Sequence, residues 1–117
     1  MISGLGEHIR KRREALRTTD KAFSLRQVAQ RVKVEPSYLS KVERGLEVPS
    51  EATVRRIAEE LGANPDVLLA LAGKVSSDLQ QVIRKRPELF AQVIRDLAQL
   101  PDHAVLRVVR EVRDGTW

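Results

Sequence analysis

Ser37, Tyr38 and Lys41 place a hydroxyl, a phenol ring and an ammonium group close together in the sequence. A serine hydroxyl donates or accepts a hydrogen bond, a tyrosine ring can contact a thymine methyl group, and a lysine can reach a guanine edge. The three residues follow Glu35-Pro36, a pair that typically begins a helix because proline has no N–H to leave unsatisfied. Side chains in the first turns of such a helix can approach base edges in a major groove.

Two short helices joined by a tight turn are predicted between residues 24 and 45. In the first, Val28, Ala29 and Val32 fall on one face, and in the second Leu39 and Val42 point inward. The small side chain of Ala29 suits the point where two such helices cross. This is the layout of a helix-turn-helix, although an ordinary helical hairpin with a solvated polar face also fits this segment taken alone.

A further helix is predicted over residues 5–16, where Leu5, Ile9 and Leu16 share one face. Arg13 lies near that face, and an arginine at a core face needs an acidic partner. Glu43, at the end of the second short helix, is the obvious acid. We therefore predict an ion pair between Arg13 and Glu43.

Two more helices are predicted after the turn at Gly45, which can adopt a left-handed cap conformation. Ser50 can cap a helix over residues 51–61 that Gly62 stops. Asn64-Pro65 can then begin a fifth helix. The apolar residues expected to extend the core from these two helices are Val54, Ile57, Ala58, Leu61, Val67, Leu68, Leu69 and Leu71.

Several motifs stand at matching spacing, namely Ile9-Arg10-x-x-Arg13, Ser24 to Val32, Tyr38-Leu39-Ser40-x-x-Glu43-x-Gly45, Pro49-Ser50-x-x-Thr53 and Ala58-x-x-Leu61-Gly62. Together they resemble the Xre family, the Cro/C1 type of phage-repressor-like transcriptional regulator. The resemblance covers residues 4–72, with the helix-turn-helix at about 24–45, and implies an all-α, five-helix DNA-binding domain. It implies base contacts from Ser37, Tyr38 and Lys41, and phosphate contacts from Ser24, Arg26, Gln27, Ser40, Arg44 and Thr53.

Two residues and one connecting segment depart from the family pattern. Lys33 replaces the glycine that many members have at the left-handed position of the turn, at a cost of roughly 1 kcal/mol. Leu25 replaces a glutamine and cannot hydrogen-bond to phosphate, so either Arg26 or Gln27 takes over that contact or the docking angle shifts. The connection over residues 17–23 is longer than usual, and we expect a surface loop with a basic tip.

The C-terminal region, residues 76–114, is predicted to form one short helix and then an antiparallel hairpin of two amphipathic helices. So short a hairpin can hardly bury its apolar stripe alone. The stripe could fold back on the first domain, form a homodimer or hold a different protein. The dimer is our preferred interpretation, with an interface formed by Leu89, Phe90, Val93, Ile94, Leu97, Val105, Leu106, Val108, Val109 and Val112.

Composition narrows the function further. The chain has no cysteine, and His8 and His103 are isolated, so we expect no metal site and no cofactor. No motif typical of a catalytic site occurs, so an enzyme is not expected. No apolar run approaches the roughly 20 residues of a membrane span, and we expect a cytoplasmic protein. The net charge of +5 is concentrated in residues 1–34, which suits a polyanionic partner.

The sequence therefore predicts a sequence-specific, double-stranded-DNA-binding transcriptional regulator. The form we favour is a homodimeric repressor of an inverted-repeat operator, including its own. The alternative is an antitoxin or adaptor whose C-terminal helices bind a heterologous protein antagonist while the first domain serves autoregulation.

Overall fold

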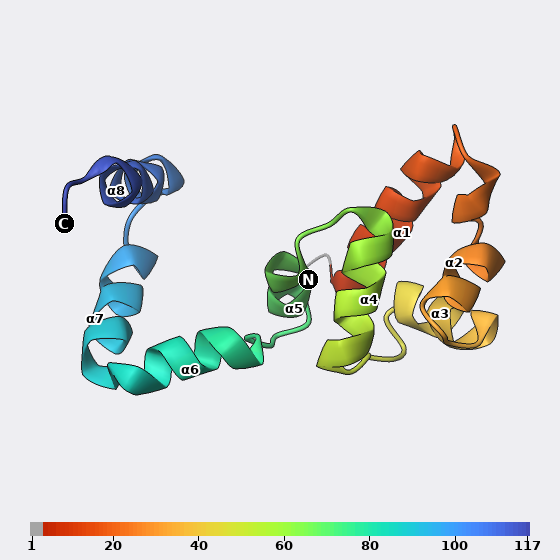
Figure 1. Ribbon diagram of the computed structural model, residues 1–117, viewed down its shortest axis with the longest axis horizontal. Coiled ribbons are helices and arrows are strands. Elements are labelled where there is room, and N and C mark those ends of the chain that lie inside the picture. Colours follow the sequence, from red (N-terminus) through yellow and green to blue (C-terminus); the bar gives the residue numbers. More distant parts are fainter. Residues whose placement is uncertain (1–3) are drawn as a thin grey trace. The chain divides into compact units, whose positions relative to one another are not determined.

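The computed structural model describes residues 4–117, and all regular structure in that range is helical (Figure 1). The chain divides into two compact units, the first ending at Ser76 and the second comprising Ser77–Trp117. No helix in the described range is long and apolar enough to cross a lipid bilayer. The helices are α1 (Leu5–Arg17), a 3₁₀ turn η1 (Lys21–Phe23), α2 (Leu25–Arg31), α3 (Pro36–Glu43), α4 (Glu51–Leu61), α5 (Pro65–Leu71), α6 (Ser77–Lys85), α7 (Pro87–Ala98) and α8 (Asp102–Asp114).

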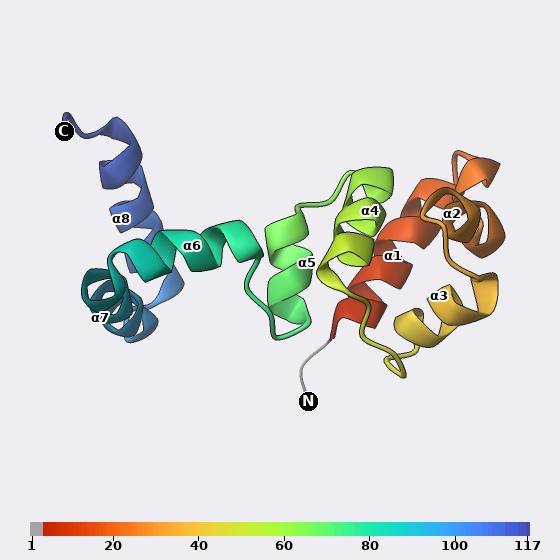
Figure 2. The same ribbon diagram turned by 60° about the horizontal axis from the view of Figure 1, so that its bottom comes forward.

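Helices α1 to α5 pack around one aliphatic core in the first unit (Figure 2). The core side chains come from the inward faces that helical periodicity predicts, so apolar burial orients all five helices. The buried apolar residues are Leu5, Ile9, Val28, Ala29, Val32, Leu39, Val42, Val54, Ile57, Ala58, Leu61, Leu68 and Leu69.

The ends of these helices are fixed by capping residues, of which Ser50, Gly62 and Asn64 are predicted from the sequence. Ser24 accepts a hydrogen bond from the backbone N–H of Gln27, and Ser50 does the same for Thr53. Asn64 accepts from the N–H of Asp66 at 2.8 Å. Gly62 adopts the left-handed conformation that ends α4. Each cap is typically worth about 1 kcal/mol, so together they set where the helices begin and end.

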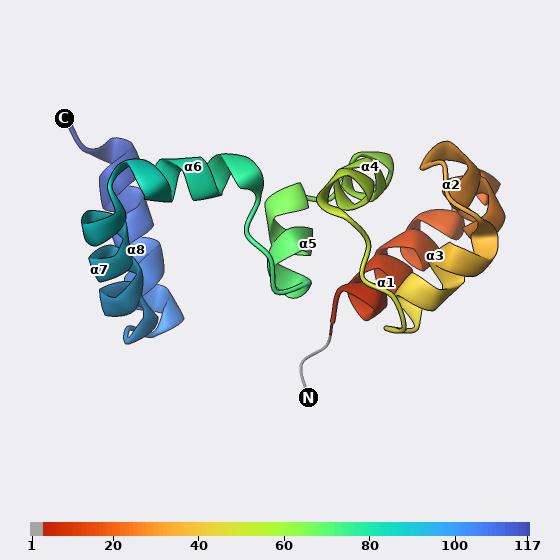
Figure 3. The ribbon, with the colours of Figure 1, turned by 90° about the horizontal axis from the view of Figure 1, so that it is seen from below.

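Helices α1 and α3 lie side by side, as the view from below also shows (Figure 3). Gly6 makes this approach possible. A Cβ added there would lie 2.6 Å from the carbonyl oxygen of Glu43 and closer still to that of Val42. Backbone atoms cannot move aside as the end of a flexible side chain can, so α1 and α3 would have to separate.

We expect Gly6→Ala to lower the free energy of unfolding by about 1–3 kcal/mol, a typical cost of overpacking. Helix propensity alone would make Gly6→Ala stabilising, because alanine normally stabilises a helix relative to glycine. A fall in the free energy of unfolding would therefore indicate the steric clash. Urea denaturation followed by circular dichroism measures the change. Lys11→Ala, at an exposed position of the same helix, is the control. An unchanged or higher midpoint for Gly6→Ala would contradict the close approach.

Two expectations for the first unit are corrected. Val67 was expected in the core but is 47% exposed, because Leu68 and Leu69 form the buried face of the short helix α5. The segment over residues 17–23 is not simply a surface loop. It contains η1, and its Phe23 is partly buried against the core.

The second unit contains α6, α7 and α8, and none of its residues is buried. Phe90, Leu97, Val105 and Val108 are half-buried. Figure 3 shows α7 and α8 running in opposite directions, as expected for the last two helices. Pro101 is extended and redirects the chain between them. The exposed apolar side chains on these helices and the α7–α8 turn are Leu79, Val82, Leu89, Val93, Ile94, Leu100, Leu106, Val109 and Val112.

Candidate nucleic-acid interface

The turn between α2 and α3 is short and held by backbone hydrogen bonds. The N–H of Val34 donates to the carbonyl oxygen of Ala29 at 3.0 Å. Lys33 has a φ of 64°, the left-handed conformation expected for it. Val32 and Ala29 are fully buried beneath the turn. The direction of α3 relative to α2 is therefore fixed by packing as well as by the turn.

Helix α3 is divided into a buried face and an exposed face. Leu39 and Val42 are in the core, whereas Ser37 and Lys41 are exposed. Tyr38 is partly buried and packs against the core with part of its ring. The three residues predicted to contact bases thus lie on one helix, with Ser37 and Lys41 exposed and Tyr38 partly buried. This arrangement suits insertion of α3 into a major groove.

The residues predicted to contact phosphates are not equally accessible. Arg26 and Gln27 are exposed on α2, and Arg44 is exposed at the end of α3. Ser24 and Ser40 are half-buried. Thr53 is buried, and its hydroxyl lies 3.2 Å from Ser50 Oγ and 3.1 Å from Arg56 Nη2. Thr53 is therefore the least accessible member of the predicted set.

Arg13 and Glu43 form a buried, two-armed ion pair between α1 and α3. Arg13 Nε donates to Glu43 Oε2 at 2.7 Å, and Nη2 donates to Oε1 at 2.9 Å. Arg13 Nη1 also donates to the carbonyl oxygen of Phe23 at 3.2 Å. Hydrogen bonding to Glu43 raises the pKa of Arg13 above its ordinary value and outweighs the opposing effect of burial. The pair thus joins α1, η1 and α3 by directional contacts.

Two arginines on α2 and α4 position the helix-turn-helix in ways the sequence analysis missed. Arg56 Nε donates to the carbonyl oxygen of Val32, at the end of α2, at 3.0 Å. Arg31 pairs with Glu60 at 2.7 Å and lies over the ring of Phe23 at 5.3 Å from its centroid. These partners are far apart in the sequence, so no local spacing could indicate them. Their effect is to tie α2 to α4 and η1.

A family model described as a helix-turn-helix domain matches residues 5–72, from α1 to just beyond α5. The chain belongs to the helix-turn-helix domain family. Two curated relatives from Mycobacterium tuberculosis, the uncharacterized HTH-type transcriptional regulators MT0491 and Rv0474, are each 41% identical over 68 residues. That alignment covers 58% of this chain and 45% of each relative. The chain therefore spans about half the length of the curated relatives it matches.

Two solved structures resemble this helix-turn-helix protein. One is the clp gene regulator ClgR from Corynebacterium glutamicum, with 28% identity, a TM-score of 0.44, and coverage of 77% of this chain and 89% of that one. The other is a complex of the SinR and SinI proteins, with 20% identity, a TM-score of 0.50, and coverage of 93% and 94%. The family match confirms the helix-turn-helix domain predicted from the sequence, and the likeness to the SinR/SinI structure agrees with the predicted all-α fold. Helix-turn-helix regulators are DNA-binding proteins rather than enzymes.

Proposed function

We propose that this helix-turn-helix protein is a homodimeric, sequence-specific transcriptional regulator that represses by occupying an inverted-repeat operator, including its own. The observation that carries the proposal is the two-sided character of α3. Leu39 and Val42 fix one side in the core, while Ser37 and Lys41 remain exposed on the other. The names of the curated relatives, HTH-type transcriptional regulators, support the same role.

In this proposal the exposed groups divide into two kinds. Ser37, Tyr38 and Lys41 discriminate bases, each good contact being worth about 1–3 kcal/mol. Phosphate contacts set register and supply the salt-dependent part of the affinity. They come from Ser24, Arg26, Gln27, Ser40, Arg44 and Thr53, and Thr53 is the least accessible of the six.

We expect Lys41→Ala to weaken specific binding by about tenfold or more while changing non-specific binding little, because its contact is to a base edge. We expect Arg26→Ala to weaken both equally and to reduce the salt dependence by about one phosphate contact. Fluorescence anisotropy with operator and with mixed-sequence duplexes measures both affinities. If each variant lost the same factor of affinity for the operator as for the mixed-sequence duplex, the division into base contacts and phosphate contacts would be contradicted.

Dimerisation is proposed through the second unit. A helix-turn-helix protein gains specificity when two recognition helices lie about 34–36 Å apart on a near-palindromic site. Several apolar side chains of α7 and α8 remain uncovered within the second unit, with Leu89 63% and Val112 59% exposed. A second copy of the same face would cover them with two-fold symmetry. Its core would be Leu89, Phe90, Val93, Ile94, Leu97, Val105, Leu106, Val108, Val109 and Val112.

The same observation favours one alternative function. The uncovered face could bind a different protein, as in an antitoxin or adaptor whose DNA-binding unit serves autoregulation. One structure with a related fold is a complex of two proteins, SinR and SinI. Light scattering of the purified chain distinguishes the two functions. A stable dimer favours the repressor, and a monomer or aggregate rescued by a co-expressed protein favours the alternative.

Footprinting on genomic fragments with competitor DNA tests the proposed function directly. We expect a protected inverted repeat with half-sites about 10 base pairs apart, centre to centre. Weak, sequence-indifferent binding that modest salt abolishes would overturn the proposal, because the basic charge alone would then account for the affinity.

A further inference from the structure

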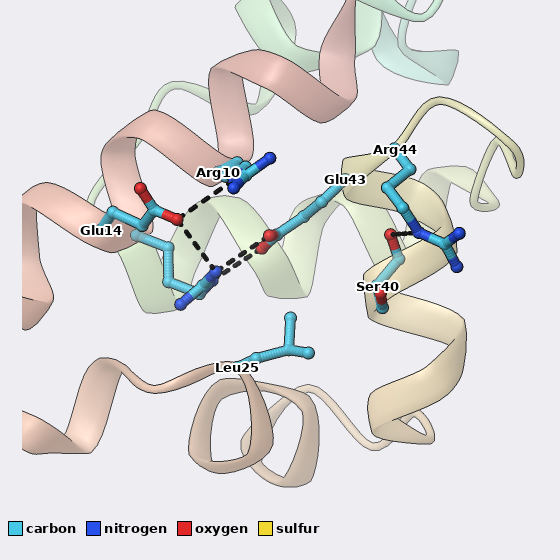
Figure 4. A pocket seen from close by; sticks show the side chains of 7 residues that line it. Arg10, Glu14, Leu25, Ser40, Glu43 and Arg44 are labelled. Atoms are coloured by element: carbon cyan, nitrogen blue, oxygen red, sulfur yellow. Dashed lines mark hydrogen bonds and ion pairs between the residues drawn. The ribbon is translucent and has the colours of Figure 1, made fainter.

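A pocket of about 240 Å³ lies between α1, the start of α2 and α3 (Figure 4). Arg10 and Glu14 line it from α1, Ser40 and Arg44 from α3, and Leu25 from α2. Ser40 and Arg44 are two of the proposed phosphate contacts. Arg10 was not among them, yet it lines the same pocket.

Four of the charged side chains around this pocket form one buried ion pair and one exposed ion pair. Arg13 and Glu43 also line it, but they are buried and paired with each other, and Arg13 Nη2 also lies 4.0 Å from Glu14 Oε1. Arg10 and Glu14 are exposed, with 60% and 51% of their side chains accessible, and they are joined by a 3.1 Å bond from Arg10 Nε to Glu14 Oε1. An exposed pair at i,i+4 spacing is weak. The bond also uses one of the five guanidinium donors of Arg10.

Leu25 gives the α2 side of the pocket an apolar wall. Its side chain has no hydrogen-bonding group, so an anion there must be held by the other walls. Arginine is well suited to this, because a guanidinium can donate two parallel hydrogen bonds to a phosphate. Arg44 already lies along α3, with its Nε 3.3 Å from the carbonyl oxygen of Ser40.

We propose that Arg10 is a further phosphate contact and that Glu14 competes with the DNA for it. This inference rests on the proposed DNA binding and adds to it. When a phosphate enters the pocket, Arg10 exchanges the carboxylate of Glu14 for a phosphate oxygen. Glu14 therefore lowers the affinity for DNA, and loss of its charge tightens binding without any new side chain.

The test is a double-mutant cycle of Glu14→Gln and Arg10→Gln, with a labelled mixed-sequence duplex as probe at several salt concentrations. A phosphate contact is independent of sequence, so no operator is needed. We expect Glu14→Gln to tighten binding by about two- to fivefold, the range that an exposed pair supports. We expect the slope of log affinity against log salt to change by about 0.9 on loss of Arg10. In the Arg10→Gln background, Glu14→Gln should have little effect.

Glu7→Gln is the matched control. Glu7 pairs with Lys11 at 2.9 Å on the same helix, with the same i,i+4 spacing and the same 51% side-chain exposure as Glu14. Glu7→Gln removes the same negative charge as Glu14→Gln, but at a position that pairs with Lys11 instead of Arg10. Thermal unfolding of each variant checks that these exposed substitutions leave the fold intact.

Two results would overturn the inference. Glu14→Gln could tighten binding no more than Glu7→Gln, which would indicate a general effect of net charge. The gain could also persist without Arg10, which would exclude competition for that side chain. If the wild-type chain binds duplex DNA and all variants match it, only this inference fails. If the wild-type chain does not bind, the proposed function fails with it.

Discussion

Glu43→Ala is expected to lower the free energy of unfolding by about 3–5 kcal/mol, because it leaves Arg13 buried without its counter-charge. Both side chains are only 6% exposed, so water cannot replace the lost carboxylate. Arg13 also holds the carbonyl oxygen of Phe23, so the disturbance should reach η1 and the start of α2. Urea denaturation followed by circular dichroism measures the loss.

Two further variants show whether burial of the charge is the cause. Glu14→Ala removes an exposed carboxylate that also lies 4.0 Å from Arg13 Nη2, and it should cost less than about 1 kcal/mol because water can reach that side chain. The double replacement Arg13→Met with Glu43→Leu removes both charges and should recover much of the loss, as apolar replacement of buried pairs often does. A Glu43→Ala protein as stable as Glu14→Ala would contradict the structural role of the pair.

Ile94→Asp should convert the proposed dimer into a monomer and reduce operator affinity by about 100-fold or more. Ile94 is 53% exposed within the chain, so the substitution does not place a charge in the core of either unit. In a dimer, however, the carboxylate would be buried in an apolar interface without a partner, at a cost of several kcal/mol. Light scattering and anisotropy measure the two effects.

Ala91→Asp provides the comparison for Ile94→Asp. It adds the same charge to the same helix at an exposed position outside the predicted interface. It should remain dimeric and bind the operator normally. Both variants should show the melting transition of the first unit unchanged, since that unit has its own core. A dimeric Ile94→Asp protein that protects the same repeat would rule out this face as the interface.

Helix ends and the core of the first unit could be predicted because their determinants are local. Ser50 and Gly62 mark the ends of α4 by their own hydrogen bonding and conformation, whatever the rest of the chain does. The ion pair between Arg13 and Glu43 could be predicted although its partners are 30 residues apart. A guanidinium near a core face requires an acid, and Glu43 lies at the end of the helix that packs on that face.

Other features depend on partners distant in the sequence and could not be predicted. Arg56 meets Val32 only because α4 crosses the end of α2. Periodicity placed Val67 inward, but only packing shows that Leu68 and Leu69 take the inward face of so short a helix.

The second unit has three well-formed helices but no buried residue, and this links its integrity to the abundance of the protein. Helices of 9 to 13 residues with so little enclosed apolar surface gain most of their stability when another surface covers them. In the proposed dimer, association and ordering of α7 and α8 are one equilibrium, governed by protomer concentration. At concentrations too low for this dimer to form, proteases could cleave the uncovered helices. The first unit would then remain as an intact fragment with a single DNA-binding surface and a low affinity for DNA.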